Sequence, residues 1–185
     1  MKTLIFDTET TGLPDWKEPS EAPHQPHIVQ LAAILFDEEL RKIQASMNLV
    51  VRPDGWSIPP EVSAVHGIDD ELAHSIGVPE FSVIESFLNL VNVADRRAAY
   101  NTNFDDRIIR IGLKRFYDDD RAEAYKAGDK FCVMRACSDE VGIGKFPKLT
   151  AAYLHFTGKE LEGAHDALAD AKAALEIHRI MAGLV

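Results

Sequence analysis

Three groups of residues in the sequence could together form an enzyme site: two contain carboxylates alone, and the third contains a carboxylate and a histidine. Asp7 and Glu9 stand two residues apart, directly after the apolar residues 4–6. Strand side chains alternate between the two faces, so both carboxylates project from one face of the strand that the apolar run predicts. Two like charges held side by side indicate a site for a cation. A pair of solvated acids at a strand end is the alternative for these two residues alone.

Asp105 lies one turn inside a predicted helix that begins where a short strand ends. Asn101 or Asn103 is expected to cap this helix, and Phe104 to pack into the core. An acid in the first turn also stabilises a helix through the helix dipole. Asp105 is therefore a candidate metal ligand only in combination with the other acids.

His165 and Asp170 form the third group. A separation of five residues turns them roughly 140° apart on a helix, so they cannot easily share one helical face. We therefore expect Asp170 inside the helix, Asp166 at its N-cap and His165 just before it. An imidazole in this position lies near a metal site without being a ligand, as a general base requires. A structural hydrogen bond is the alternative role for His165.

The elements that must position these groups follow from hydrophobic periodicity. Strands are predicted near residues 4–6, 28–36, 46–52, 98–100 and 131–134, and helices near 80–93, 104–116, 148–156 and 166–181. Residues 14–27 contain four prolines and two histidines and are expected to form a loop, and residues 118–121 a solvated helix end or loop. This order predicts an α/β fold with one mixed five-stranded sheet flanked by helices.

Length and composition set the remaining expectations. With 185 residues, of which 46% are hydrophobic and 27% charged, we expect a single domain spanning residues 1–185. The N-terminal apolar run is too short for a signal peptide or a membrane span, and the two cysteines are too few for a disulfide framework. A cytoplasmic, soluble protein is predicted, with Cys132 and Cys137 as ordinary thiols.

The net charge of −10 opposes nucleic-acid binding unless bound divalent cations invert the local field. We therefore expect a preference for short single strands over long duplexes and a distributive reaction. The candidate basic contacts are Arg107, Arg110, Lys114 and Arg115 on one helix, with Lys145 and Lys148 later in the chain.

Taken in order, the motifs resemble the DEDDh class of 3′-to-5′ exonucleases, which includes the proofreading subunit of bacterial replicative polymerases. Residues 7–12 (Asp-Thr-Glu-Thr-Thr-Gly), 101–105 (Asn-Thr-Asn-Phe-Asp) and 165–170 (His-Asp-Ala-Leu-Ala-Asp) match its three motifs. Residues 58–61 and 65–68 resemble its connecting segment, and the resemblance covers nearly the whole chain. It implies an RNase H-like fold and release of 5′-mononucleotides from 3′ ends.

The resemblance also implies roles for individual residues. Asp7 would bridge two Mg²⁺ or Mn²⁺ ions, which suit hard oxygen ligands. Glu9 and Asp170 would complete the ligands of the first ion, and Asp105 would hold the second. His165 would be the general base. The terminal nucleotide would contact Thr10, Leu13, His66, Asn101 and Phe104, with Leu13 as an apolar wedge. Trp16 either stacks on a base or covers the core.

Two positions depart from the family pattern: Tyr100 stands where many relatives have histidine, and Gln30 where many have an acid. DNA is the favoured substrate, with RNA ends or short oligoribonucleotides as the alternative, because family motifs do not separate the two. A non-catalytic binding module with the same fold is the alternative of another class. Because the chain stops at Val185, directly after the last predicted helix, we expect no tail that would tether it to a polymerase, and association with a polymerase is a hypothesis that no such tail supports.

Overall fold

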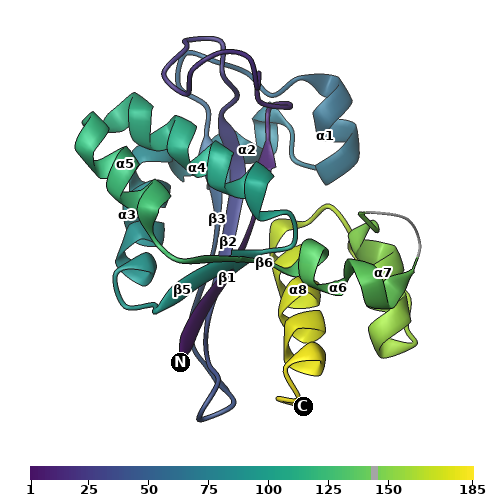
Figure 1. The fold of residues 1–185 in the computed structure, drawn as a ribbon. Coiled ribbons are helices and arrows are strands. Elements are labelled where there is room, and N and C mark those ends of the chain that lie inside the picture. Colours follow the sequence, from purple (N-terminus) through teal and green to yellow (C-terminus); the bar gives the residue numbers. More distant parts are fainter. Residues whose placement is uncertain (143–145) are drawn as a thin grey trace.

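The computed structural model describes residues 1–142 and 146–185, and it is built around one mixed sheet (Figure 1). The strand order is β4-β3-β2-β1-β5-β6. Strands β1 to β3 form an antiparallel meander, while β5 lies parallel to β1, β6 parallel to β5 and β4 parallel to β3. The strands span Lys2–Thr10 (β1), Ile28–Asp37 (β2), Lys42–Arg52 (β3), Val78–Pro79 (β4), Arg96–Ala99 (β5) and Lys130–Cys132 (β6).

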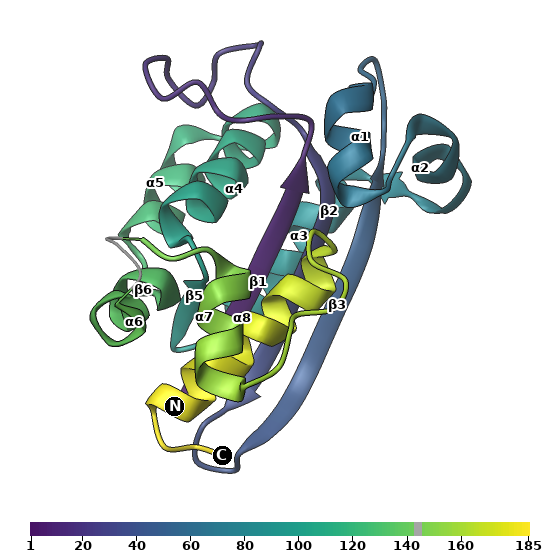
Figure 2. The same cartoon turned by 90° about the vertical axis from the view of Figure 1, so that its right-hand side faces the viewer.

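Helices cover both faces of the sheet (Figures 1 and 2). One face packs against α3 (Glu80–Val91) and α4 (Thr102–Phe116), with α5 (Asp119–Ala127) beside α4. The other face carries α8 (Ala167–Met181), flanked by α6 (Val133–Val141) and α7 (Leu149–Thr157). Two short helices, α1 (Pro60–His66) and α2 (Asp70–Ile76), lie beside β3.

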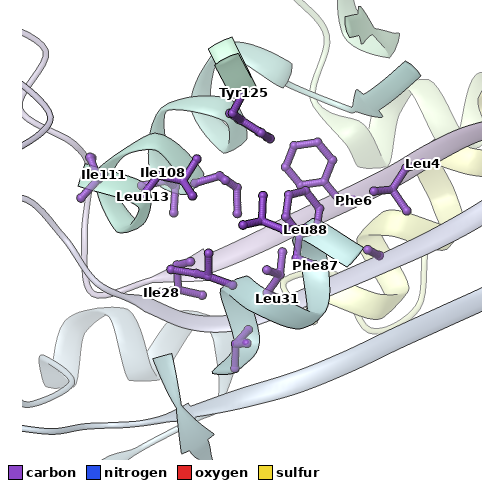
Figure 3. Close-up of a cluster of buried hydrophobic side chains, with 14 of the residues drawn as sticks. Leu4, Phe6, Ile28, Leu31, Phe87, Leu88, Ile108, Ile111, Leu113 and Tyr125 are labelled. Atoms are coloured by element: carbon purple, nitrogen blue, oxygen red, sulfur yellow. The ribbon is translucent and has the colours of Figure 1, made fainter. Parts of the chain in front are cut away.

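The alternation of side chains along β1 divides the core into two halves. Leu4 and Phe6 point toward α3 and α4 and pack with Phe87 and Ile108 (Figure 3). Ile5 points to the opposite face and packs with residues of α8. Since residues 7 and 9 continue the odd positions, the acids that follow in β1 face the α8 side.

Several predicted boundaries are wrong for identifiable reasons. The sheet has a sixth strand, β4, whose two residues carry no periodic signal. The strand expected at 131–134 ends at Cys132, because Val133 begins α6 and buries the helical stripe Val133, Cys137 and Val141. Residues 118–121 start helix α5, with Asp118 as an N-cap that accepts a hydrogen bond from the Arg121 amide at 3.0 Å.

The loop at residues 14–27 is ordered by a buried amide side chain. Gln25 is 2% exposed; its Oε1 accepts from the Asp15 amide at 3.0 Å, and its Nε2 donates to the carbonyls of Asp15 and Pro19 at 2.9 and 3.0 Å. Arg107 of α4 adds a hydrogen bond to the Glu18 carbonyl. The loop is therefore fixed from within and tied to α4.

Two further expectations concern the chain as a whole. Both cysteines are free thiols, Cys137 buried and Cys132 half-buried, as predicted. Among residues 1–142 and 146–185, no helix has the length and apolar character needed to cross a membrane.

Candidate active site

The carboxyl end of β1 and the start of α8 bring three candidate residues together. Glu9, His165 and Asp170 each place a ligand-type atom within 4.8 Å of the others. Asp170 lies in the first turn of α8 on its buried face and is 9% exposed. The spacing of Asp7 and Glu9 on β1 directs both toward this helix, as their alternation predicts.

Asp105 joins the group from the other side of the sheet. It is 3% exposed, and its Oδ1 accepts hydrogen bonds from the backbone amide and hydroxyl of Thr8, at 3.0 and 2.8 Å. Thr8 is the residue between the two β1 acids, so this contact holds the first turn of α4 against them. Of the two predicted caps, Asn101 occupies the N-cap position, but its side chain makes no capping hydrogen bond.

The four acids share one environment in which Asp105 and Asp170 are buried and Asp7 and Glu9 are half-buried. Burial, followed by repulsion from Asp105, Asp170 and Glu9, raises the pKa of Asp7 well above its usual range. Burial and then Asp170 and Asp105 raise the pKa of Glu9 to about 8. The pKa of Asp105 rises to about 7, chiefly through burial, and burial also raises the pKa of Asp170. This is the electrostatic signature of a site that positive charge would stabilise.

The surroundings of one carboxylate oxygen indicate whether these residues fit a metal ion. Asp170 Oδ1 is buried and has no hydrogen-bond partner among the described residues, whereas Oδ2 accepts from the His165 amide at 3.2 Å. Buried carboxylate oxygens normally have partners. Carboxylate oxygens, one of them buried and without a partner among the described residues, suit a hard divalent cation.

His165 is presented by a tight turn before α8. It is exposed and has a left-handed backbone with φ 70°, which is uncommon for a residue other than glycine. Asp166 follows as the N-cap, as expected, and accepts from the Ala169 amide at 2.9 Å. The imidazole of His165 thus lies at the rim of the acid cluster formed by Asp7, Glu9, Asp105 and Asp170, while the backbone amide of His165 donates to Asp170.

Gln30 supports this turn, a role that the sequence does not reveal. Its Nε2 donates to Asp166 Oδ2 and to Asn48 Oδ1, both at 2.9 Å, and its Oε1 accepts from the Ala167 amide at 3.1 Å. Gln30 is 3% exposed on β2. The available signal was a lone polar side chain within the apolar run at residues 28–36.

The predicted substrate contacts divide into two groups. Thr10 and His66 lie by the site. Burial and nearby His165 lower the pKa of His66, while a hydrogen bond with the Thr10 backbone opposes that shift. The Thr10 hydroxyl donates to the Gly12 carbonyl at 2.7 Å, and His66 Nδ1 accepts from the Ile68 amide at 3.2 Å. Leu13 is 82% exposed and Asn101 is exposed, while Phe104 packs partly against the core.

The candidate basic contacts are separated by the structure. Arg115 is held by Glu80 at 3.1 Å and Lys114 by Asp119 at 2.7 Å. Lys148 is exposed at the start of α7, and Lys145 lies outside the described residues. Arg107 and Arg110 border a hollow that also contains Trp16. Trp16 is 59% exposed and therefore does not cover the core.

Comparison with known proteins decides the family. The family model described as "Exonuclease" matches residues 4–178. The chain belongs to the exonuclease family. The resemblance and the prediction of a nuclease enzyme are thereby confirmed. A similar protein is the uncharacterized exonuclease CP81 of Escherichia phage 186, which is 29% identical over 182 residues covering 94% of this chain and 84% of that protein.

Solved structures of exonuclease I have the same fold. The zinc-bound complex of Escherichia coli exonuclease I with single-stranded DNA is 26% identical with a TM-score of 0.76, covering 98% of this chain and 40% of that chain. The complex of the same enzyme with a dT13 oligonucleotide is 26% identical with a TM-score of 0.74, covering 97% and 40%. The RNase H-like fold is confirmed. The chain spans about two fifths of the length of these structures.

Proposed function

We propose that this exonuclease removes nucleotides from the 3′ end of single-stranded DNA and releases 5′-mononucleotides. One observation carries the proposal: acids from β1, α4 and α8 gather in one largely buried cluster, with an Asp170 oxygen that has no partner among the described residues and with His165 at the rim. Phosphodiester hydrolysis needs positive charge near the phosphate and a base near water, and this arrangement provides residues for both.

The carboxylates of Asp7, Glu9, Asp105 and Asp170 would hold two divalent cations, Mg²⁺ or Mn²⁺. When bound, the cations supply positive charge that stabilises the phosphoryl oxygens, the ionised water and the departing 3′ oxygen. Thr8 holds Asp105 in place for this role through two hydrogen bonds. The His165 amide holds one oxygen of Asp170 and leaves the other for a cation.

His165 accepts the proton of the attacking water at a ring nitrogen. Its exposure keeps the ring accessible to water and substrate, while the bonds of Asp166 and Gln30 fix the turn that carries it. Thr10, Leu13, His66, Asn101 and Phe104 bind the terminal nucleotide. Leu13 is the wedge against the last bases, since an apolar side chain that is 82% exposed is available for contact with a ligand.

Two similar structures support DNA as the substrate, because both are complexes of exonuclease I with single-stranded DNA or a dT13 oligonucleotide. RNA is the alternative substrate, and the treatment of the 2′-OH would separate the two. The comparison of matched DNA and RNA strands therefore belongs in the first experiment.

The test follows mononucleotide release from 3′-labelled and 5′-labelled single strands with Mg²⁺, Mn²⁺ or chelator. We expect metal-dependent release of the 3′ label first, and a loss of about 10²–10⁴-fold in kcat for His165→Ala. His155→Ala, at an exposed histidine on α7, is the matched control and should retain activity. Metal-independent cleavage, or equal rates for the two variants, would refute the mechanism. No turnover with either metal would favour the non-catalytic binding module.

A further inference from the structure

A hollow of about 200 Å³ lies beside α4, lined by four cationic side chains and a tryptophan. Arg107 and Arg110 come from α4, Lys126 from the end of α5, Lys130 from the start of β6, and Trp16 from the loop at residues 14–27. The loop, α4 and the junction of α5 with β6 therefore bring basic groups and one exposed aromatic ring to the same place.

Helical spacing connects this hollow to the acid cluster. Asn103, Arg107 and Arg110 are four and three residues apart, so they share one face of α4. Asn103 also lines the hollow. Asp105, two residues further along, points instead to Thr8 and the acid cluster. The first turn of α4 thus borders both places, and a strand leaving the acid cluster over this turn enters the hollow.

The hollow is positive in a chain whose net charge is −10. Arg107 hydrogen-bonds to backbone carbonyls of Asp15 and Glu18, and no carboxylate of the described residues pairs with it. Among the described residues, Asp106 is the one carboxylate that lines the hollow; it is 4% exposed and already bound by Arg97 and Lys130.

Arg110 and Lys126 share the carboxylate of Glu123, each at 3.3 Å. The Nε atoms of Arg107 and Arg110 are buried without a hydrogen-bond partner in the described part of the chain. The hollow thus offers more positive charge and more donors than its own acids satisfy, which matches the chemistry of a phosphate backbone.

Trp16 makes the hollow suited to a single strand. Its side chain is 59% exposed, yet its loop is fixed by Gln25 and by Arg107 itself. Exposed aromatic rings next to cations stack on unpaired bases, which a duplex does not present. We propose that the DNA strand upstream of its 3′ terminus crosses this hollow, with a base stacked on Trp16 and phosphates contacting Arg110 and Lys126. The direction of the strand rests on the proposed function.

Binding of a fluorescent single-stranded dodecamer, measured by anisotropy in chelator over a range of salt concentrations, tests the proposal without catalysis. Trp16→Ala should weaken binding about fivefold or more. Lys126→Gln should reduce the slope of log K against log salt by about 0.7, the value for one phosphate contact on a single strand. Lys42→Gln, at an exposed lysine on β3, is the matched control and should leave the slope unchanged.

A second readout separates this proposal from the catalytic one. With Mg²⁺, the ratio of kcat/KM for the dodecamer to that for a trinucleotide should fall in Trp16→Ala. If the wild type releases no mononucleotides but Trp16→Ala and Lys126→Gln still bind the dodecamer as predicted, the proposed function is overturned and the DNA path across the hollow is retained. Normal 3′ trimming, with Trp16→Ala and Lys126→Gln binding the dodecamer as Lys42→Gln does, would overturn the strand path alone.

Discussion

Burial controls the ionisation of the acid cluster and links metal binding to stability. The pKa of Glu9 is about 8 and that of Asp105 about 7, against ordinary values near 4 for both residue types. A carboxyl whose pKa is raised by folding stabilises the native state below its unfolded pKa and loses that contribution as pH rises through its folded pKa. The metal-free protein should therefore lose stability between about pH 4.5 and pH 8, and a bound cation should offset the loss.

Glu9→Gln tests this coupling. In chelator at pH 8, its thermal midpoint should exceed that of the wild type by a few degrees, and the difference should vanish below about pH 4, where Glu9 is protonated in both the native and the unfolded state. Glu71→Gln, at an exposed position on α2, is the control. Equal midpoints for wild type and Glu9→Gln at pH 8 would contradict the role assigned to burial.

Gln30→Met keeps the size of the side chain and removes its hydrogen bonds to Asp166, Asn48 and Ala167. We expect a loss of about 1–3 kcal/mol in the free energy of unfolding, the cost of leaving buried polar groups unsatisfied. The rate of mononucleotide release should fall as well, because the turn that presents His165 loses its anchor. Urea unfolding and initial rates would measure both. Gln44→Met, exposed on β3, should change neither, and the prediction fails if the two variants behave alike.

For single residues, the sequence is most informative where chemistry and spacing coincide. The N-cap role of Asp166 and the placement of Asp170 inside α8 are confirmed, because a capping residue before a helix leaves a local signature. The left-handed backbone of His165 and the bonds of Gln30 depend on contacts across the fold. No local pattern predicts them.

Gly77 determines how closely α2 packs against β3. Its φ of −74° suits any residue, but a Cβ there would lie 2.3 Å from the Ala73 carbonyl oxygen and 2.6 Å from the Arg52 nitrogen. Gly77→Ala should therefore lower the free energy of unfolding by about 1–3 kcal/mol or more, as overpacking does. Urea unfolding would measure the loss. Ser75→Ala, exposed on the same helix, should have a free energy of unfolding near that of the wild type. If Gly77→Ala were as stable as Ser75→Ala, the backbones of α2 and β3 would be able to move apart without cost.

The helices that the sequence predicts best are the long ones with an apolar stripe. Helices α3, α4 and α8 carry apolar stripes over twelve to fifteen residues and were expected. Helices α1 and α2 have seven residues each, and α1 buries none of them, so no stripe exists to detect. The apolar run at residues 131–134 is too short for periodicity to separate a strand from the first turn of α6.

The net charge of the whole molecule affects how often DNA is released. A chain with a net charge of −10 repels DNA except at its cation site and at the basic hollow, so release after each cleavage should be frequent. With excess unlabelled strand added after the reaction starts, labelled strands should stop after losing one or a few nucleotides. Gel resolution of product lengths would show this. Fully digested strands beside intact ones, with few intermediates, would indicate processive action instead.

The anchored loop has a consequence for protein engineering. Its base is closed by the Thr11 amide, which donates to the His27 carbonyl at 3.0 Å, and its interior is filled by Gln25, while Trp16, Lys17 and His24 are exposed at its surface. The anchoring contacts use the Gln25 side chain and backbone carbonyls of the loop, so a library that randomises the side chains of Trp16 and Lys17 leaves the scaffold intact. Strand-length and base preferences are thus open to laboratory evolution while the hydrolytic residues stay unchanged.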